Sequence, residues 1–228
     1  MLDRAATRGN LMDSLAAAVA AGVDRVQLRE RGMEGAALLE LADAVCRCAR
    51  SAAVSAGRSV AIVVNRRADV ALACEADGVH LGFDALPLRQ ARALLGTEAL
   101  IGVSCHSAAE VALLTGDDTQ LAEADYAHLA PIFPPLSKEA TRPALGPQAL
   151  GRPAAALPVL AQGGVDASNA AACLAAGAAG VAVTGAILMA SDPGAAARQL
   201  RRALDDAAHL GDGATLGSSA GDGTGGGG

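Results

Sequence analysis

Aromatic side chains are almost missing from this sequence. Its 228 residues include no Trp, one Tyr and two Phe, although 52% of the residues are apolar. A core of this size must therefore be built from Ala, Val and Leu, which favours a layered architecture in which helices lie close against a sheet. The lack of aromatic groups for base stacking, together with a formal net charge of −6, argues against nucleic-acid binding.

Long apolar runs and a regular cysteine pattern are also lacking. No run approaches the roughly 18 residues that a membrane span needs, and no charged segment leads into an apolar one as in a signal peptide. The five cysteines are an odd and scattered set, which is typical of reduced thiols in the cytoplasm. We therefore expect a cytoplasmic protein with no membrane partner.

The pattern that is present is an alternation of strands and helices. Short β-branched runs occur at 25–29, 60–64, 78–81, 100–104, 126–131, 157–162 and 180–184. Ala- and Leu-rich helical stretches lie near 10–22, 34–57, 66–75, 87–95, 107–115, 145–152, 167–176 and 192–209. Continuous apolar strands that alternate with helices predict a parallel sheet covered on its faces. Residues 211–228 have almost nothing to bury, so we expect one domain over 1–210 followed by a disordered tail.

The strand count is one short of a (β/α)₈ barrel of the TIM type, which needs eight strands. We therefore expect an α/β barrel whose first strand is truncated or missing, because only Met1 to Asp3 remain to supply its end. Either the true start lies upstream, or the barrel is open at this seam. A doubly wound open sheet is the alternative, and it is disfavoured because no G-x-G-x-x-G follows the first strand.

Polar residues follow the predicted strands, at the end where barrels of this type place their chemistry. They make the mouth cationic on a chain that is net acidic, which favours a small anionic ligand. Each residue also has a purely structural explanation, since Arg and Lys side chains can be solvated at the rim and Ser104 or His106 can cap the next helix. The candidates are Gln27, Arg29, Arg31, Asn65, Ser104, His106 and Lys138.

Two glycine-containing turns predict where the anion binds. Gly163 and Gly164 follow the strand at 157–162, and Thr184 and Gly185 open a short helix after the last strand. Unpaired backbone N–H groups at such turns, with the partial positive charge of a helix N-terminus, form phosphate sites in this class of barrel. The alternative is that Gly163 and Gly164 only make a tight turn.

Five long segments resemble the thiamine phosphate synthase/TenI family. They are "VQLRER", "VVNRRADVALACEADGVHLG", "GVSCHSAAEV", "DYAHLAPIFPPLSK" and "VLAQGGVDASNAAACLAAGAAGVAVTGAI", and they follow one another in order. The resemblance runs from about Asp3 to about His209, and the family's leading strand survives here only as "LDR". It implies a barrel that acts on a thiazole phosphate.

The synthase type of this family joins a hydroxymethylpyrimidine pyrophosphate to a thiazole phosphate and releases pyrophosphate. The resemblance then implies Mg²⁺ held by two aspartates. Arg66 stands at one of these positions, and the loop after "HLG" reads Phe83-Asp84-Ala85, so Asp84 is the one ligand left under this interpretation. Residues that match the synthase pattern are Gln27, Arg29, Asn65, Ser104 and Lys138.

The TenI type resembles the sequence better where it departs from the synthases, as in Arg-Glu-Arg after the first predicted strand and the Thr184-Gly185 turn. It implies a thiazole tautomerase without metal or cofactor. We expect this isomerase, with His106 as general acid and base because an ordinary His pKa near ~6.5 suits proton transfer in both directions, and with Ser104 and Lys138 as further catalytic side chains.

Two alternatives to the tautomerase stay open. One is the synthase, a transferase, and the other is a catalytically degenerate phosphate-binding or regulatory barrel. The sequence leaves the oligomeric state undecided, so a homo-oligomer remains compatible with every one of these functions.

Overall fold

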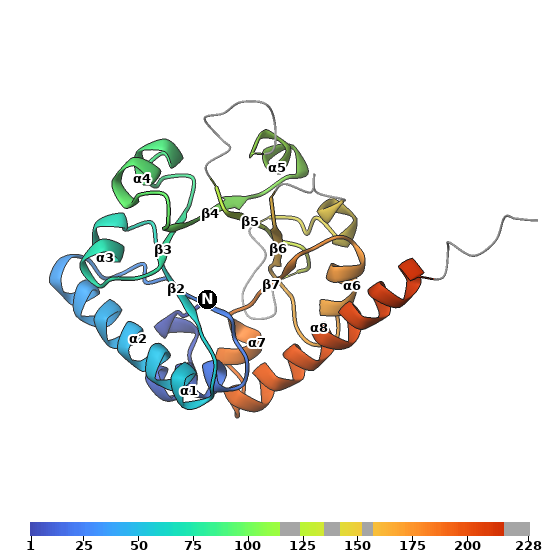
Figure 1. Ribbon diagram of the computed structural model, residues 1–228, viewed down its shortest axis with the longest axis horizontal. Coiled ribbons are helices and arrows are strands. Elements are labelled where there is room, and N and C mark those ends of the chain that lie inside the picture. The colour runs from blue at the N-terminus through green and yellow to red at the C-terminus, as the bar shows by residue number, and fades with distance from the viewer. Residues whose placement is uncertain (115–123, 135–141, 152–156, 217–228) are drawn as a thin grey trace, which may run out of the picture.

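Seven parallel strands form one curled sheet surrounded by helices in the computed structural model, which describes residues 1–114, 124–134, 142–151 and 157–216 (Figure 1). The strands are β1 (Arg25–Leu28), β2 (Ala61–Asn65), β3 (Gly78–Leu81), β4 (Leu100–Cys105), β5 (Tyr126–Leu129), β6 (Val159–Gln162) and β7 (Gly180–Ala182). Every predicted strand is present, within a few residues of its expected bounds.

The helices lie on the outside of the ring of strands (Figure 1). The α-helices are α1 (Leu11–Ala20), α2 (Gly35–Ser55), α3 (Ala68–Ala73), α4 (Leu88–Leu95), α5 (Ala108–Leu114), α6 (Ala170–Ala175), α7 (Gly185–Leu188) and α8 (Pro193–Leu216), and the 3₁₀ turns are η1 (Arg4–Ala6) and η2 (Pro147–Leu150). None of the described helices is long and apolar enough to cross a membrane.

Two helical predictions differ from the structure. The helix expected near 145–152 is only the turn η2, because Gly146 and Gly151, both at positive φ, flank it and Pro147 begins it. The last helix, α8, continues to Leu216, past the boundary expected at residue 210. The rest of the expected tail, 217–228, lies outside the described residues.

The order of the strands decides between the two expected folds. Each strand pairs with the one before it in sequence, from β1 through β7, and every pair is parallel. A doubly wound sheet reverses its order at a switch point, and no reversal occurs here. The barrel prediction is confirmed, with its first strand missing.

Leu2 alone stands where the first strand would be. It pairs in parallel with Leu28: the Leu2 N–H donates to the Gln27 carbonyl at 2.7 Å, and the Arg29 N–H donates to the Leu2 carbonyl at 2.9 Å. The amino nitrogen of Met1 donates to the carbonyl of Val183, just after β7, at 2.6 Å. The ring is therefore closed by one residue at the carboxyl ends of the strands.

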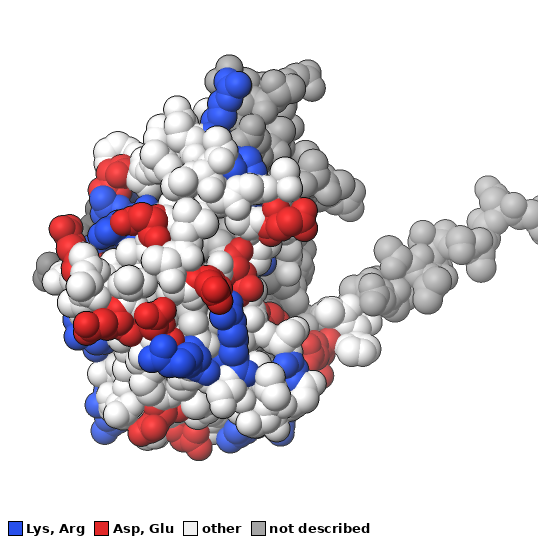
Figure 2. Space-filling view, turned by 60° about the vertical axis from the view of Figure 1, so that its left-hand side comes forward, with Lys and Arg blue, Asp and Glu red and all other residues white. Residues whose placement is uncertain are grey.

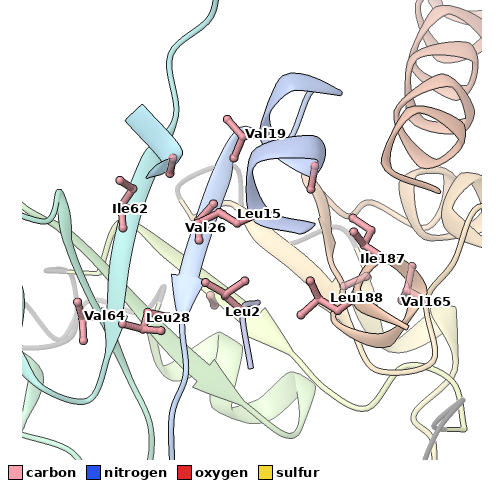
Figure 3. Close-up of a cluster of buried hydrophobic side chains, with 14 of the residues drawn as sticks. Leu2, Leu15, Val19, Val26, Leu28, Ile62, Val64, Val165, Ile187 and Leu188 are labelled. Atoms are coloured by element: carbon pink, nitrogen blue, oxygen red, sulfur yellow. The ribbon is translucent and has the colours of Figure 1, made fainter. Parts of the chain in front are cut away.

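The main core lies between the sheet and the helices. Val26, Leu28, Ile62 and Val64 alternate with residues that face the barrel interior, and all four are buried (Figure 3). In the same view Leu2 lies between Leu28 and Leu188. This small-residue core follows from the composition, in which Val, Leu and Ala replace aromatic side chains.

Charges of both signs are interspersed on the face that includes α2, α3 and α4 (Figure 2). Many of them are paired locally, such as Arg67 with Asp69 at 2.6 Å and Arg50 with Asp77 at 3.9 Å. The described residues of this face form no continuous basic surface. This agrees with a small-molecule partner better than with a nucleic acid.

Candidate functional site

The carboxyl ends of β1 and β2 bring two predicted site residues together. The Gln27 side chain donates through Nε2 to Oδ1 of Asn65 at 2.9 Å, inside the barrel mouth. Gln27 is buried, and its Oε1 atom has no hydrogen-bond partner among the described residues. The hydrogen bond thus fixes the two amide side chains against each other and leaves Gln27 Oε1 as an acceptor for a ligand.

A second polar group crosses the barrel interior from β3 to β5. His80 Nε2 lies 2.9 Å from Ser104 Oγ, and His80 Nδ1 lies 3.2 Å from the Tyr126 hydroxyl. The ring of His128 is 4.2 Å from the His80 ring between centroids, and its Nδ1 is 2.9 Å from Gln162 Oε1. Ser104, predicted as catalytic, is therefore held by a buried histidine.

Both interior histidines are kept neutral. Burial lowers the pKa of His80 to about 3, and the charge of Arg25 lowers it further. Burial, followed by the proximity of His80, lowers the pKa of His128 well below its ordinary value. His80 lies in the strand predicted at 78–81, but sequence reasoning did not single out His128 or Tyr126 as site residues. The signal available was a polar residue at the inward positions of the strand "YAHL".

His106 lies just after β4 at the start of α5. Its backbone N–H donates to Glu110 Oε2 at 2.8 Å, its ring Nδ1 is 3.6 Å from the same oxygen, and the Glu110 N–H donates to Ser107 Oγ at 3.1 Å. Ser107 thus caps the start of α5 and the Glu110 carboxylate pairs with the N–H of the preceding residue, His106, so a structural explanation for the "SCHS" segment is present. The ring remains a third exposed, and its catalytic role stays a prediction.

Arginines lie at the rim after β1. Arg29 Nη1 lies 3.5 Å from Asp3 Oδ2, and burial, followed by the nearby charge of Arg31, lowers the pKa of Arg29. Arg31 is exposed. Positive charge at this edge is therefore only partly neutralised. Lys138, the remaining predicted cation, lies outside the described residues.

The glycine turn after β6 has a packing function as well as open donors. Gly163 and Gly164 both have positive φ, and a Cβ atom on Gly163 would lie 2.9 Å from Pro131 Cα. A Cβ atom on Gly164 would meet the carbonyl of Pro134. Glycine is thus required where this turn approaches the loop after β5. The N–H groups of both glycines face no acceptor in the described part of the chain.

The turn after β7 offers similar donors. Thr184 precedes α7, and its carbonyl accepts from the N–H groups of Ile187 and Leu188. The N–H groups of Gly185 and Ala186 lack an acceptor among the residues described, as first-turn N–H groups of a helix do. Thr184 Oγ1 is buried without a partner there. Together with Gly163 and Gly164, this turn gives the mouth a set of unused backbone donors.

The positions implied for Mg²⁺ hold an ion pair instead. Arg66 Nη2 lies 2.8 Å from Asp84 Oδ2, and both side chains are about half exposed. Within the described ranges no group of three His, Cys, Asp or Glu side chains could hold a metal ion. Mg²⁺ is bound by oxygen ligands, usually including carboxylates that balance its charge. A positively charged guanidinium beside the carboxylate repels the ion. The residues present therefore do not fit a Mg²⁺ site.

Comparison with known proteins identifies the family. The family model described as thiamine monophosphate synthase matches residues 1–187. The thiamine-phosphate synthase of Chlorobium luteolum is 40% identical over 194 residues, which cover 83% of this chain and 85% of that protein. The chain belongs to the thiamine monophosphate synthase family.

Further relatives agree with this family. The thiamine biosynthesis bifunctional protein ThiM/ThiE of Symbiobacterium thermophilum is 42% identical over 82% of this chain, and the chain spans only 37% of that longer protein. The solved thiamine phosphate pyrophosphorylase of Pyrococcus furiosus superposes with a TM-score of 0.74 at 25% identity, covering 90% of this chain and 94% of that one. A role in thiamine biosynthesis follows, and the resemblance drawn from the sequence motifs is confirmed.

Proposed function

We propose that this member of the thiamine monophosphate synthase family is a transferase that joins a hydroxymethylpyrimidine pyrophosphate to a thiazole phosphate. The similarity along most of its length to chains named thiamine-phosphate synthase carries the proposal. None of the relatives named above is named as a tautomerase, so the alternative interpretation of the sequence fits better than the isomerase that we expected first.

The chemistry needs a site that stabilises a leaving pyrophosphate. The bond between the pyrimidine methylene carbon and the pyrophosphate oxygen breaks, its electrons leave with the pyrophosphate, and the thiazole nitrogen forms a new bond to that carbon. Guanidinium groups suit the departing anion because they form charge-assisted hydrogen bonds with phosphate oxygens. Arg29, Arg31 and Arg66 supply such groups at the ends of β1 and β2.

The thiazole phosphate has a separate candidate site on the other side of the mouth. The open N–H groups of Gly163, Gly164 and Gly185, with the unused hydroxyl of Thr184, suit a phosphate monoester. The Gln27–Asn65 pair and Ser104 lie on the strand ends of the same mouth, where they would orient the pyrimidine by hydrogen bonds. The pyrophosphate would thus bind at the ends of β1 and β2, and the thiazole phosphate at the turns after β6 and β7.

The role of Arg66 determines whether an arginine or a metal ion neutralises the negative charge of the pyrophosphate. The guanidinium of Arg66 pairs with Asp84, which makes this carboxylate unavailable to a metal ion, and both side chains are about half exposed. We propose that the protein contributes no metal ligands there and that Arg66 exchanges Asp84 for the leaving pyrophosphate. The coupling rate should then survive EDTA. Arg66→Gln should lower kcat at least tenfold, while Arg67→Gln, whose side chain pairs with Asp69 on α3, should leave it near the native value.

The test measures thiamine phosphate by mass spectrometry after the purified chain is mixed with both substrates, with EDTA or with added Mg²⁺. Formation of the product supports the transferase. A strict requirement for Mg²⁺, or an increase of Mg²⁺-dependent rate in Arg66→Gln, would show that Asp84 is a metal ligand after all. No product under either condition would overturn the proposed function.

The tautomerase remains a second candidate because of one observation, the Arg66–Asp84 ion pair at the expected metal position. Under that function His106→Asn should keep the melting temperature and lower the proton-shift rate on a carboxythiazole phosphate by about 10² or more. Loss of stability without loss of activity per folded molecule would leave His106 as the cap of α5 only.

A further inference from the structure

Three polar side chains form a hydrogen-bonded relay that leads from the barrel interior to the mouth. The hydroxyl of Tyr126 on β5 lies 3.2 Å from Nδ1 of His80 on β3, and His80 Nε2 lies 2.9 Å from Ser104 Oγ on β4. Tyr126 is 2% exposed and His80 is 1% exposed, whereas Ser104 is only partly buried. Of the three, Ser104 alone can therefore touch a ligand in the mouth.

A glycine on β4 makes room for this relay. His80, Gly102 and Tyr126 pair across β3, β4 and β5 at one level of the sheet, and Ser104 lies two residues nearer the mouth. A Cβ atom on Gly102 would collide with Cζ of the Tyr126 ring. The absence of a side chain at this position lets the tyrosine cross β4 and reach the histidine on the strand beyond it.

A neighbouring cation sets the direction of the Tyr126 hydroxyl. The guanidinium carbon of Arg25 lies 4.0 Å from the centroid of the tyrosine ring. Burial raises the pKa of Tyr126 to about 12, although the charge of Arg25 opposes this shift, so the hydroxyl keeps its proton. A guanidinium has only donors, which favours an orientation with the phenol oxygen towards Arg25 and the hydrogen away from it. Among the described residues the acceptor for this hydrogen is Nδ1 of His80.

The direction is passed through His80 to Ser104. Burial lowers the pKa of His80 to about 3, so the ring is neutral and only one of its nitrogens carries a hydrogen. Because Nδ1 accepts from Tyr126, this hydrogen is on Nε2 and is donated to Ser104 Oγ. The opposite tautomer would leave the Tyr126 hydrogen buried without an acceptor in the described part of the chain, which is costly. The hydrogen of Ser104 is then left for a ligand.

We propose that Tyr126 is a positioning residue that acts through His80 to make Ser104 a hydrogen-bond donor to the substrate. This role rests on the proposed transferase function, in which Ser104 orients the pyrimidine. The ring nitrogens of a pyrimidine are acceptors, so a hydroxyl that is held as a donor matches one of them. A hydroxyl without this direction would donate to His80 part of the time, and the ring would be held less firmly.

The tautomer of His80 tests the relay without any substrate. Nitrogen-15 NMR of the chain labelled in its histidine rings distinguishes a nitrogen that carries hydrogen from one that does not, and His80→Asn assigns the signals. We expect the hydrogen on Nε2 in the native chain, and a larger share on Nδ1 in Tyr126→Phe, which keeps the ring but lacks the hydroxyl. Hydrogen on Nδ1 in the native chain, or the same tautomer in Tyr126→Phe, would overturn the proposal.

Calorimetric binding of hydroxymethylpyrimidine pyrophosphate tests the effect on the ligand. Ser104→Ala should weaken binding about tenfold and Tyr126→Phe at least about threefold, since each removes or misdirects one hydrogen bond. Ser104→Ala should have a smaller effect in the Tyr126→Phe chain than in the native chain, because the two changes act on the same donor. Ser14→Ala, which removes a buried hydroxyl from α1 outside the sheet, is the control and should bind as the native chain does.

Two binding results would overturn the proposal. One is that the effects of Ser104→Ala and Tyr126→Phe simply multiply in the double variant, with melting curves that show every chain to be folded. The other is an equal loss of affinity for inorganic pyrophosphate, which has no ring for Ser104 to orient. Failure of the transferase is distinct, because a chain that forms no thiamine phosphate but shows the expected tautomer and binding keeps the positioning role of Tyr126.

Discussion

The two buried histidines should make the fold sensitive to mild acid. His80 is held between the Ser104 and Tyr126 hydroxyl groups, and His128 stacks on it, so neither ring has room for a hydrated proton. The pKa of His80 falls from 6.5 to about 3 on folding. Below pH 6.5 the unfolded chain binds a proton that the folded chain rejects, so stability present above this pH is lost as the pH falls towards 3.

The magnitude follows from linkage. Each pH unit between the two pKa values costs about 1.4 kcal/mol, so lowering the pH from 6.0 to 4.5 should cost about 2 kcal/mol through His80 alone. His128 acts in the same direction because burial also lowers its pKa. The range from pH 6.0 to 4.5 lies below the titration of the Met1 amino group. Its pKa is lowered to about 6 by burial, so its effect on stability falls mainly between pH 8 and 6 as the pH is lowered.

Urea denaturation at pH 6.0 and 4.5 measures this loss. His80→Asn removes the titrating group and should reduce the loss by about 2 kcal/mol, whatever its effect on stability at pH 6.0. His209→Gln, which changes an exposed histidine on α8, should keep the native pH dependence. A His80→Asn chain that loses as much stability as the native chain would refute the reasoning.

Three further predictions concern the packing. Gly102→Ala should destabilise the fold by about 1–3 kcal/mol, since its Cβ would meet the Tyr126 ring, whereas Gly32→Ala, with open space around it, should not; equal urea midpoints would contradict this. Leu2→Ala should lower the free energy of unfolding, measured by urea titration, by about 2–5 kcal/mol because Leu2 is buried between Leu28 and Leu188. An equal loss of stability from Leu113→Ala, which changes an exposed leucine, would show that the burial of Leu2 is not the cause. Cys46 and Cys105 should react with a thiol reagent at pH 8 only after unfolding, because burial raises the pKa of each to about 12; fast reaction of the native chain at either position, located by mass spectrometry, would be inconsistent with their burial.

The strands were predictable because each is a short apolar run with turn residues on both sides. The turn η2 was not, since the helical stretch at 145–152 gave no weight to Gly146 and Pro147 at its start. The open seam was predictable from a count of strands. That Met1 to Asp3 supply the end of the missing strand was predicted too, but which of these residues pairs with β1 required the structure, because a single parallel bridge has no sequence pattern.

Part of the candidate site was also predictable from the sequence, and part was not. Residues at the carboxyl ends of strands were found because a parallel sheet gathers these ends, as with Gln27 and Asn65. The contact between His80 and Tyr126 joins residues 46 apart in sequence, which only the curvature of the sheet brings together. Arg66 was recognised as a departure from the synthase pattern, but its pairing with Asp84 required the structure.

One measurement tests the central claim, that this barrel mouth performs pyrophosphate displacement. Phosphorus NMR of the purified chain with hydroxymethylpyrimidine pyrophosphate and thiazole phosphate follows both anions in one tube. The account predicts that free pyrophosphate and thiamine phosphate appear at equal rates, and that Arg66→Gln slows both equally. Release of pyrophosphate without thiamine phosphate, or no change in either substrate with a folded protein, would contradict it.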